Sequence, residues 1–145
     1  MGWTALTYSA GEVLTSAKMA QLQANAAAVR NRAEISASRD LSLADGNISY
    51  TGAGFTPRRI RCYAPYYNGT ASEINMGASD GTTSRFLFSA VVPTAIGTGI
   101  VRLYYSATLY VTVTLVSFDS DGVTVTYTKT GSPIGTVVWR ILLEG

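Results

Sequence analysis

Histidine is absent from this chain of 145 residues, and cysteine occurs once, as Cys62. Without histidine, the Ser-His-Asp and Cys-His arrangements of nucleophilic catalysis and histidine-based metal sites are excluded. A single cysteine can form neither an internal disulfide nor a multi-cysteine zinc site within one chain. We therefore interpret Cys62 as a small buried apolar residue, and we expect no catalytic residues, no cofactor and no bound metal.

Charged residues are also scarce, at 14% of the chain, against roughly 25% in an average soluble protein. The net charge of +2 is too small to indicate a nucleic-acid partner. No run of about 18 apolar residues occurs, so we expect no membrane span. The first residues lack the pattern of a secretory signal. A surface with so few charges suggests that much of it contacts protein rather than water.

One stretch has the period of a helix, residues 11–31, GEVLTSAKMAQLQANAAAVRN. Thr15 and Ser16 are suited to cap its start. Apolar residues then recur at spacings of three and four, which places on one stripe Met19, Leu22, Ala26, Val29 and Ala33. The stripe is too short for a stable free coiled coil, so the helix needs a partner surface. That surface is either the sheet of its own chain or another copy or subunit.

We interpret residues 1–35 as an N-terminal attachment or oligomerisation segment. The residues expected at its interface, together with a tryptophan near the C-terminus, are Trp3, Leu14, Met19, Leu22, Ala26, Val29 and Trp139. Residues 36–47 are interpreted as a connector, because SASRD and ADGN are turn-forming clusters without sustained periodicity. The stretch NGTASEINMGASDGTTS, residues 68–84, is polar, and we assign no strand to it.

Residues 48–145 alternate as β-strands do, most clearly over 109–115 and 123–127. Between these two runs, DSDG at 119–122 predicts a hairpin loop with positive φ at Gly122. The last strand, residues 136–143, is apolar on both faces apart from Arg140, so we expect it in a central position or beneath a subunit contact. Six to eight short strands with glycine-rich turns predict a mainly β protein: an antiparallel, jelly-roll-like β-sandwich preceded by one N-terminal α-helix.

Three groups of residues are candidates for binding. Asp119 and Asp121 of DSDG could suggest calcium, but an EF-hand needs a third ligand before the glycine and a distal glutamate, so a hairpin is favoured. Arg59 and Arg61 of PRRIR indicate an exposed face or a subunit salt bridge rather than nucleic-acid contact. The segment Tyr66-Tyr67-Asn68 could stack on and hydrogen-bond a host glycan, although tyrosine is also frequent in strands and interfaces.

Three segments together resemble virion proteins of tailed bacteriophages. GWTALTYSAGEVLTSAKMAQLQANAAAV resembles their N-terminal turn into an alanine-rich helix. ISYTGAGFTPRRIRCYA is similar to a strand pair in the β-rich domains of tail-fibre and head-decoration proteins. VSFDSDGVTVTYTKTGSPIGTVVWRILLEG resembles the hairpin and final strand that close those domains. The segments follow one another in the expected order and cover roughly half of the chain.

The resemblance implies a non-enzymatic virion component, usually a homotrimer, whose N-terminal segment attaches or assembles and whose β-domain lies outermost. Its expected partners are copies of itself and a major capsid protein or tail subunit. Its expected location is the capsid surface or the tail. The first hypothesis is a trimeric decoration, or cement, protein that stabilises the head. The alternative is a tail-fibre-like or tail-associated module that binds host surface glycans.

Overall fold

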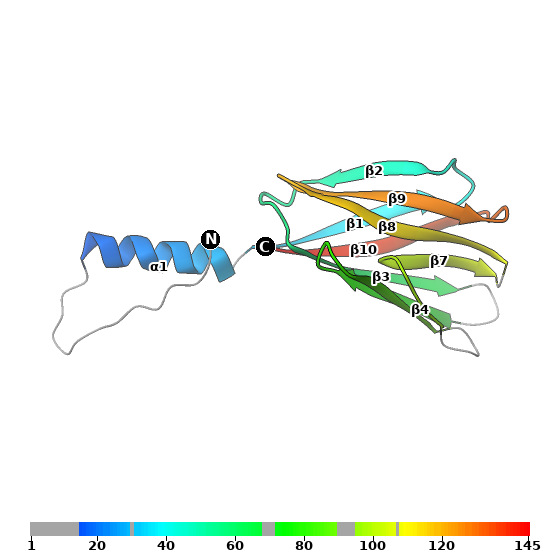
Figure 1. The fold of residues 1–145 in the computed structure, drawn as a ribbon, viewed down its shortest axis with the longest axis horizontal. Helices are drawn as coiled ribbons and strands as arrows, with labels where there is room; N and C mark the ends of the chain where they lie inside the picture. The colour runs from blue at the N-terminus through cyan, green and yellow to red at the C-terminus, as the bar shows by residue number, and fades with distance from the viewer. Residues whose placement is uncertain (1–14, 30, 68–71, 90–94, 107) are drawn as a thin grey trace.

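The computed structural model describes residues 15–29, 31–67, 72–89, 95–106 and 108–145, with the side chains of 27–29, 65–67, 72–73, 88–89 and 95 outside that description. These residues form one helix and ten strands (Figure 1). In chain order the elements are α1 (Ser16–Val29), β1 (Arg32–Asp40), β2 (Gly46–Thr51), β3 (Arg59–Tyr67), β4 (Ser72–Ser79), β5 (Ser84–Ser89), β6 (Ala95–Gly97), β7 (Val101–Ser106), β8 (Leu109–Asp119), β9 (Gly122–Thr130) and β10 (Thr136–Glu144).

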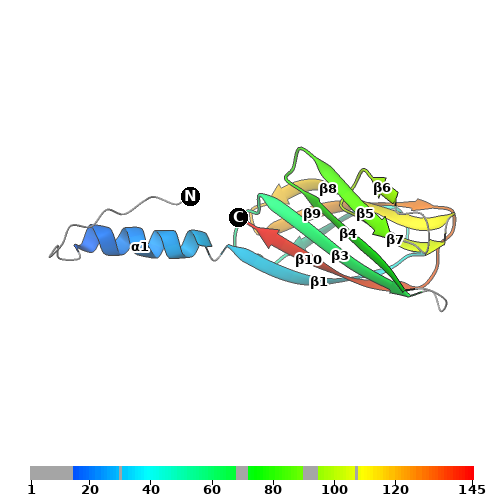
Figure 2. The same ribbon diagram turned by 90° about the horizontal axis from the view of Figure 1, so that it is seen from below.

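The strands form two sheets that pack face to face. The six-stranded sheet has the order β1-β10-β3-β4-β5-β6, and the four-stranded sheet has the order β2-β9-β8-β7. Every pairing is antiparallel. The predicted antiparallel β-sandwich with one N-terminal helix is therefore confirmed. The early strands β1 and β2 pair with the late strands β10 and β9, so residues from both ends of the β-region lie side by side (Figures 1 and 2).

The core lies between the sheets and is centred on Trp139 of β10. Strand β10 alternates strictly, with Val137, Trp139, Ile141 and Leu143 buried. The Trp139 ring meets Tyr50 of β2 and Tyr127 of β9 edge-on, with centroids 5.9 and 6.4 Å away. Aromatic pairs favour this geometry, because the positive edge of one ring faces the negative face of another. The Tyr50 and Tyr127 hydroxyls are hydrogen-bonded to each other, so both are satisfied inside the core.

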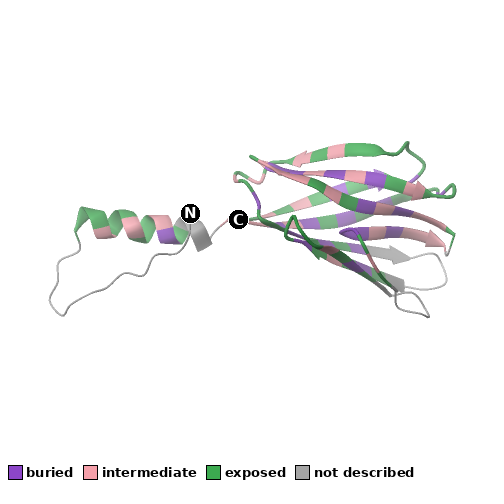
Figure 3. Ribbon diagram, viewed as in Figure 1, coloured by how far each residue is buried: buried purple, intermediate pink, exposed green. Residues whose placement is uncertain are grey.

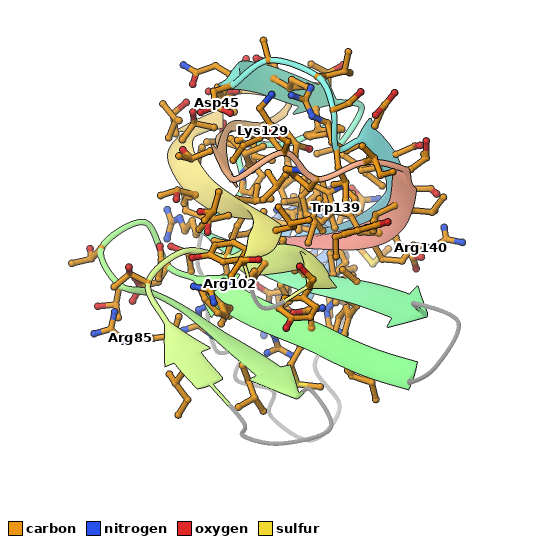
Figure 4. The ribbon with its side chains drawn as sticks, turned by 90° about the vertical axis from the view of Figure 1, so that its right-hand side faces the viewer. Asp45, Arg85, Arg102, Lys129, Trp139 and Arg140 are labelled. Carbon is orange, nitrogen blue, oxygen red and sulfur yellow. The ribbon has the colours of Figure 1, made fainter. Side chains whose placement is uncertain are left out.

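This position corrects one expectation. Trp139 is fully buried within its own chain, so the prediction that its side chain belongs to an intersubunit interface is wrong. Figure 4 shows it between the sheets, whereas the next residue, Arg140, points outward. The predicted interior position of the last strand is correct, since β10 lies between β1 and β3. The burial of Cys62 is confirmed as well, and this burial raises the pKa of its thiol.

The division at residues 36–47 is also corrected. Residues 32–40 are strand β1, so the sandwich begins at Arg32 and the predicted connector is wrong over its first part. Ala33, which we expected on the helix stripe, pairs in β1 with Leu143. The inward residues of β1 include a small alanine, Ala37, and a buried arginine, Arg39, whose guanidinium lies 4.4 Å from the centroid of the Tyr127 ring. Small and charged inward residues gave this strand a weak hydrophobic alternation.

Strand β4 was missed entirely, because its polarity is inverted. Its inward positions carry Asn75, Gly77 and Ser79, and its outward positions carry Ile74, Met76 and Ala78. Asn75 is fully buried, and neither polar atom of its amide has a hydrogen-bond partner. Residues 72–79 therefore look polar in the sequence, although they form a strand in the middle of the larger sheet. The six-stranded sheet therefore has polar β4 residues on its inner face and apolar β4 residues on its outer face.

The predicted DSDG hairpin is confirmed between β8 and β9, and Gly122 has a positive φ of 158°. The Asp121 carboxylate accepts hydrogen bonds from the backbone N–H groups of Gly52 and Gly54. Its backbone oxygen accepts another from the N–H of Ala53, at 3.1 Å. The hairpin therefore fixes the GAG loop that follows β2. This loop contact joins two of the segments that resemble phage proteins, because Gly52 and Gly54 belong to one and Asp121 to the other.

Asp121→Ala should lower the free energy of unfolding by about 1–3 kcal/mol, because two backbone donors lose a charged acceptor. Urea denaturation followed by tryptophan fluorescence measures the change. Ser120→Ala is the control: it alters the neighbouring exposed residue of the same turn and should leave stability within about 0.5 kcal/mol. Equal stability of Asp121→Ala and the wild type would show that the loop holds its shape without this carboxylate.

Candidate interaction surfaces

Helix α1 begins where the sequence predicts. The Thr15 hydroxyl oxygen accepts a hydrogen bond from the backbone N–H of Lys18 at 3.3 Å, which is the N-cap geometry. The helix ends at Val29, and β1 begins at Arg32. It extends beyond one end of the sandwich rather than lying across a sheet (Figures 1 and 2). Of the two partner surfaces that we considered, the sheet of its own chain is thus not the one used here.

The predicted apolar stripe of α1 is exposed. Met19 is 45% and Leu22 39% accessible, and Ala26 is exposed as well. The more covered line of the helix is polar: it includes Gln21 and the buried Asn25, whose side chains are hydrogen-bonded to each other at 3.0 Å. Figure 3 shows exposed positions along much of the helix, interrupted by intermediate and buried ones. In a single chain Met19, Leu22 and Ala26 therefore face solvent.

The other predicted site residues are placed as follows. Trp3, Leu14 and Asn68 lie outside the described residues, as do the side chains of Val29, Tyr66 and Tyr67. The backbone of Tyr66 and Tyr67 is the end of β3, where these residues pair with Glu73 and Ser72. The interface prediction can thus be followed at Met19, Leu22 and Ala26. The glycan prediction can be followed only as far as the strand that carries its tyrosines.

The aspartates of DSDG serve the fold. The hydroxyls of Thr124 and Ser117 donate hydrogen bonds to the Asp119 carboxylate, both at 2.7 Å, and hold the pKa of that carboxyl below its usual value. Asp121 is engaged by the GAG loop. Among the described residues, no three His, Cys, Asp or Glu side chains form a group that could hold a metal ion. In the same part of the chain, no helix is long and apolar enough to cross a membrane.

A second apolar surface lies on the outer face of the six-stranded sheet, and the sequence did not indicate it. Four side chains form a row across β3, β4, β5 and β6, because Tyr63 pairs with Met76, Met76 with Leu87, and Leu87 with Ile96. Their accessibility ranges from 38% for Leu87 to 74% for Ile96. We call this row, Tyr63-Met76-Leu87-Ile96, the apolar row. It lines a hollow of about 440 Å³ that is open to solvent.

A cationic row adjoins the apolar row two residues further along the strands. Arg61 pairs with Ala78, and Ala78 with Arg85, so two guanidinium groups flank a small apolar residue. Both arginines line the hollow, and with Arg59 they also line a neighbouring hollow of about 340 Å³. Arg85 donates to the backbone oxygen of Ser84 at 2.8 Å, and Figure 4 shows it at the outside of the sandwich. The outer face therefore combines an exposed apolar strip with positive charge.

A sequence signal for this surface does exist. In RFLFS the apolar residues are consecutive, so the two faces of β5 both carry apolar side chains. Phe86 is buried on the inner face, and Leu87 is exposed on the outer face. A strand that is apolar on both faces indicates cover on both faces. The last strand is apolar on both faces in the same way, but its outward residues are a mixture of exposed and half-buried side chains. The sequence did not predict β4, because the apolar residues of this strand point away from the core.

Comparison with known proteins adds no family to this geometry. No protein-family model, no curated protein and no solved structure matches the chain.

Proposed function

We propose that this protein is a non-enzymatic structural component of a tailed-bacteriophage virion, a homotrimeric decoration protein that stabilises the head. In this proposal the N-terminal segment attaches to neighbouring shell subunits and to sister copies, and the β-sandwich lies outermost. The three segments that resemble phage virion proteins support the assignment to this class. The small size of the sandwich, which has no long fibrous shaft in its described part, favours a head-bound module over a fibre.

One observation carries the proposal: α1 extends from the sandwich with Met19 and Leu22 exposed. A helix of 14 residues is marginal in water by itself. Such a helix becomes more stable when its apolar stripe is buried. Because the described residues of this stripe are exposed in the single chain, they form a surface that a partner could cover. An assembly segment on an outward-facing domain is the arrangement that a decoration protein requires.

The test is a charge placed on the stripe. Leu22→Asp and Met19→Asp should each weaken trimer association by at least about a hundredfold, because a carboxylate would be buried unpaired at the interface. Analytical ultracentrifugation at micromolar concentration measures association, and co-sedimentation with expanded shells prepared without this protein measures attachment.

Gln23→Asp is the matched control, since it adds the same charge at an exposed neighbouring position off the stripe. It should trimerise and bind shells as the wild type does. A wild-type protein that is monomeric at micromolar concentration and does not bind such shells would overturn the proposed function. Normal assembly of both stripe variants would show that α1 is not the attachment element.

A further inference from the structure

We infer that the outer face of the six-stranded sheet is a docking groove for a segment of a different protein, one that bears apolar side chains beside a row of carboxylates. The groove consists of the apolar row, Tyr63-Met76-Leu87-Ile96, and of Arg59, Arg61 and Arg85. It is separate from α1, and the inference does not depend on the trimer or on the virion.

The inverted polarity of β4 is the first observation. An isolated sheet face turned to water is stabilised by polar residues, and the opposite face by apolar ones. In β4 the amide of Asn75 is buried without a hydrogen-bond partner, whereas Met76 is 40% and Ile74 57% accessible. Leaving a buried amide unpaired destabilises the fold. A strand with this arrangement suits a sheet whose outer face is covered in the functional state.

The apolar row is continuous, which is the second observation. Its members are directly opposed cross-strand neighbours, so adjacent side chains lie about 4.5–5.5 Å apart. Four strands spaced by about 4.8 Å give a row roughly 14 Å long. A surface of this kind matches two or three apolar anchors of a partner. Exposed hydrophobic residues scattered singly would need no such explanation, whereas a contiguous strip beside a hollow does.

The charge around the groove is the third observation. Arg61 lies 3.6 Å from the carboxylate of Glu144, which also faces Arg32 at 3.8 Å, so one carboxylate is shared by two cations. Arg85 has no carboxylate partner among the described residues. Among the side chains that the structure describes, three arginines therefore face two nearby carboxylates, Asp80 and Glu144. An occupant with carboxylates would be complementary to this excess of positive charge.

The part of the chain that the structure describes offers no row of carboxylates, which is why we commit to a different protein rather than to a second copy. Helix α1 contains no acidic residue. Each described carboxylate is already engaged within its own chain: Glu34 with Arg140, Asp40 with Ser42, Asp45 with Lys129, Asp80 with Thr82 and Thr83, Asp119 with Ser117 and Thr124, Asp121 with Gly52 and Gly54, and Glu144 with Arg61. No three of these described carboxylates lie close enough together to hold a metal ion, so the described part of a sister copy presents no row of them to the groove.

The experiment selects peptides from a random 12-residue display library on the full chain, in the presence of an excess of the Leu87→Glu variant as competitor. The selected sequences should combine two or more apolar residues with two or more acidic ones. The most enriched sequence is then synthesised with a fluorophore, and its dissociation constant is measured by fluorescence polarisation. Raising the salt concentration should weaken its binding, because the contact with the arginines is screened.

Variants locate the binding. Met76→Glu, Leu87→Glu and Arg85→Glu should each weaken the selected peptide by at least about tenfold, because each adds a like charge where the peptide docks. Val116→Glu is the matched control: Val116 is similarly exposed, at 51%, but lies on β8 in the other sheet. It should bind as the wild type does. When the acidic residues of the peptide are changed to lysine one at a time, one of the single-lysine peptides should recover binding to Arg85→Glu, because Arg59 and Arg61 still attract the remaining carboxylates.

Three results of the peptide measurements would overturn the inference: selected peptides without acidic residues, equal binding to all four variants, or no rescue of Arg85→Glu by any single-lysine peptide. Circular dichroism and thermal unfolding of each variant show whether it is folded, and all of the substituted side chains are exposed. Ultracentrifugation of Met76→Glu and Leu87→Glu tests whether a second copy of this chain occupies the groove. If these variants dissociate an oligomer that the wild type forms, the groove is occupied by a second copy, and the inference is wrong.

Discussion

Trp139→Ala should lower the free energy of unfolding by about 3–5 kcal/mol, the loss expected when a large aromatic side chain is removed from a packed core. Trp139 is fully buried, and it packs against Tyr50 and Tyr127 at the centre of the sandwich. Surrounding strands cannot collapse into the space, since it is bounded by both sheets. Since small domains are stable by only about 5–15 kcal/mol, a large part of the native protein's stability would be lost.

Urea denaturation followed by far-ultraviolet circular dichroism measures this change without relying on the tryptophan removed. Val138→Ala is the control at the adjacent position, because Val138 is 53% accessible on the opposite face of β10. It should change stability by no more than about 0.5 kcal/mol. If Trp139→Ala is instead folded and stable but associates differently, Trp139 acts at a subunit interface, as the sequence suggested.

Gly122→Ala should destabilise the protein by at least about 3 kcal/mol, the upper range for a steric insertion into packed structure. A Cβ atom at this position would collide with the carbonyl oxygen of Tyr50 and would lie 2.9 Å from its carbonyl carbon and 3.1 Å from the Cα of Thr51. These are backbone atoms of β2, which is paired with β9 at this residue. The clash could be relieved only by separating the two strands.

Gly46→Ala separates the clash from the backbone angle. Gly46 has a similar φ of 151° and pairs at the other end of the same two strands, but a Cβ atom added there would have no other atom within 4 Å. Gly46→Ala should lower the free energy of unfolding by only about 1 kcal/mol, the lower end of the cost of holding a residue other than glycine in a sparsely populated backbone region. Thermal unfolding of both variants gives the comparison. Equal losses would show that the backbone angle, rather than the contact with β2, makes glycine necessary at 122.

The sequence predicted those parts of the fold in which local pattern and burial agree. In the hairpin of β8 and β9, valine and leucine alternate with threonine, and the connecting DSDG residues are typical of a tight turn. The predictions of the two strands and of the turn were therefore both correct. The start of α1 was correct because Thr15 is a side chain whose capping role is local. Strand β1 was not predicted, and its residues were assigned to the N-terminal segment and the connector. Its inward residues include Ala37 and Arg39, and an arginine is not expected in a core unless its stacking on the Tyr127 ring is known.

The candidate surfaces divide in the same way. The stripe of α1 follows from spacing along one helix, so its residues could be chosen from the sequence. The groove brings together residues of four strands, and its composition depends on cross-strand register, which periodicity within a strand does not specify. Trp139 shows the opposite error: its place on an apolar strand was clear, but which of the two faces of β10 is buried could not be read from a strand with apolar residues on both.

The pairing of β1 with β10 and of β2 with β9 bears on how the chain is made. During synthesis the ribosome releases β1 and β2 long before their partners, and contacts between residues so distant in sequence form slowly. At about 5–20 residues per second, several seconds pass before β9 and β10 emerge. Throughout that interval β1 and β2 lack the strands with which they pair in the folded protein. The nascent chain is therefore most exposed to aggregation before its last strand appears, and its sandwich closes only after translation has passed that strand.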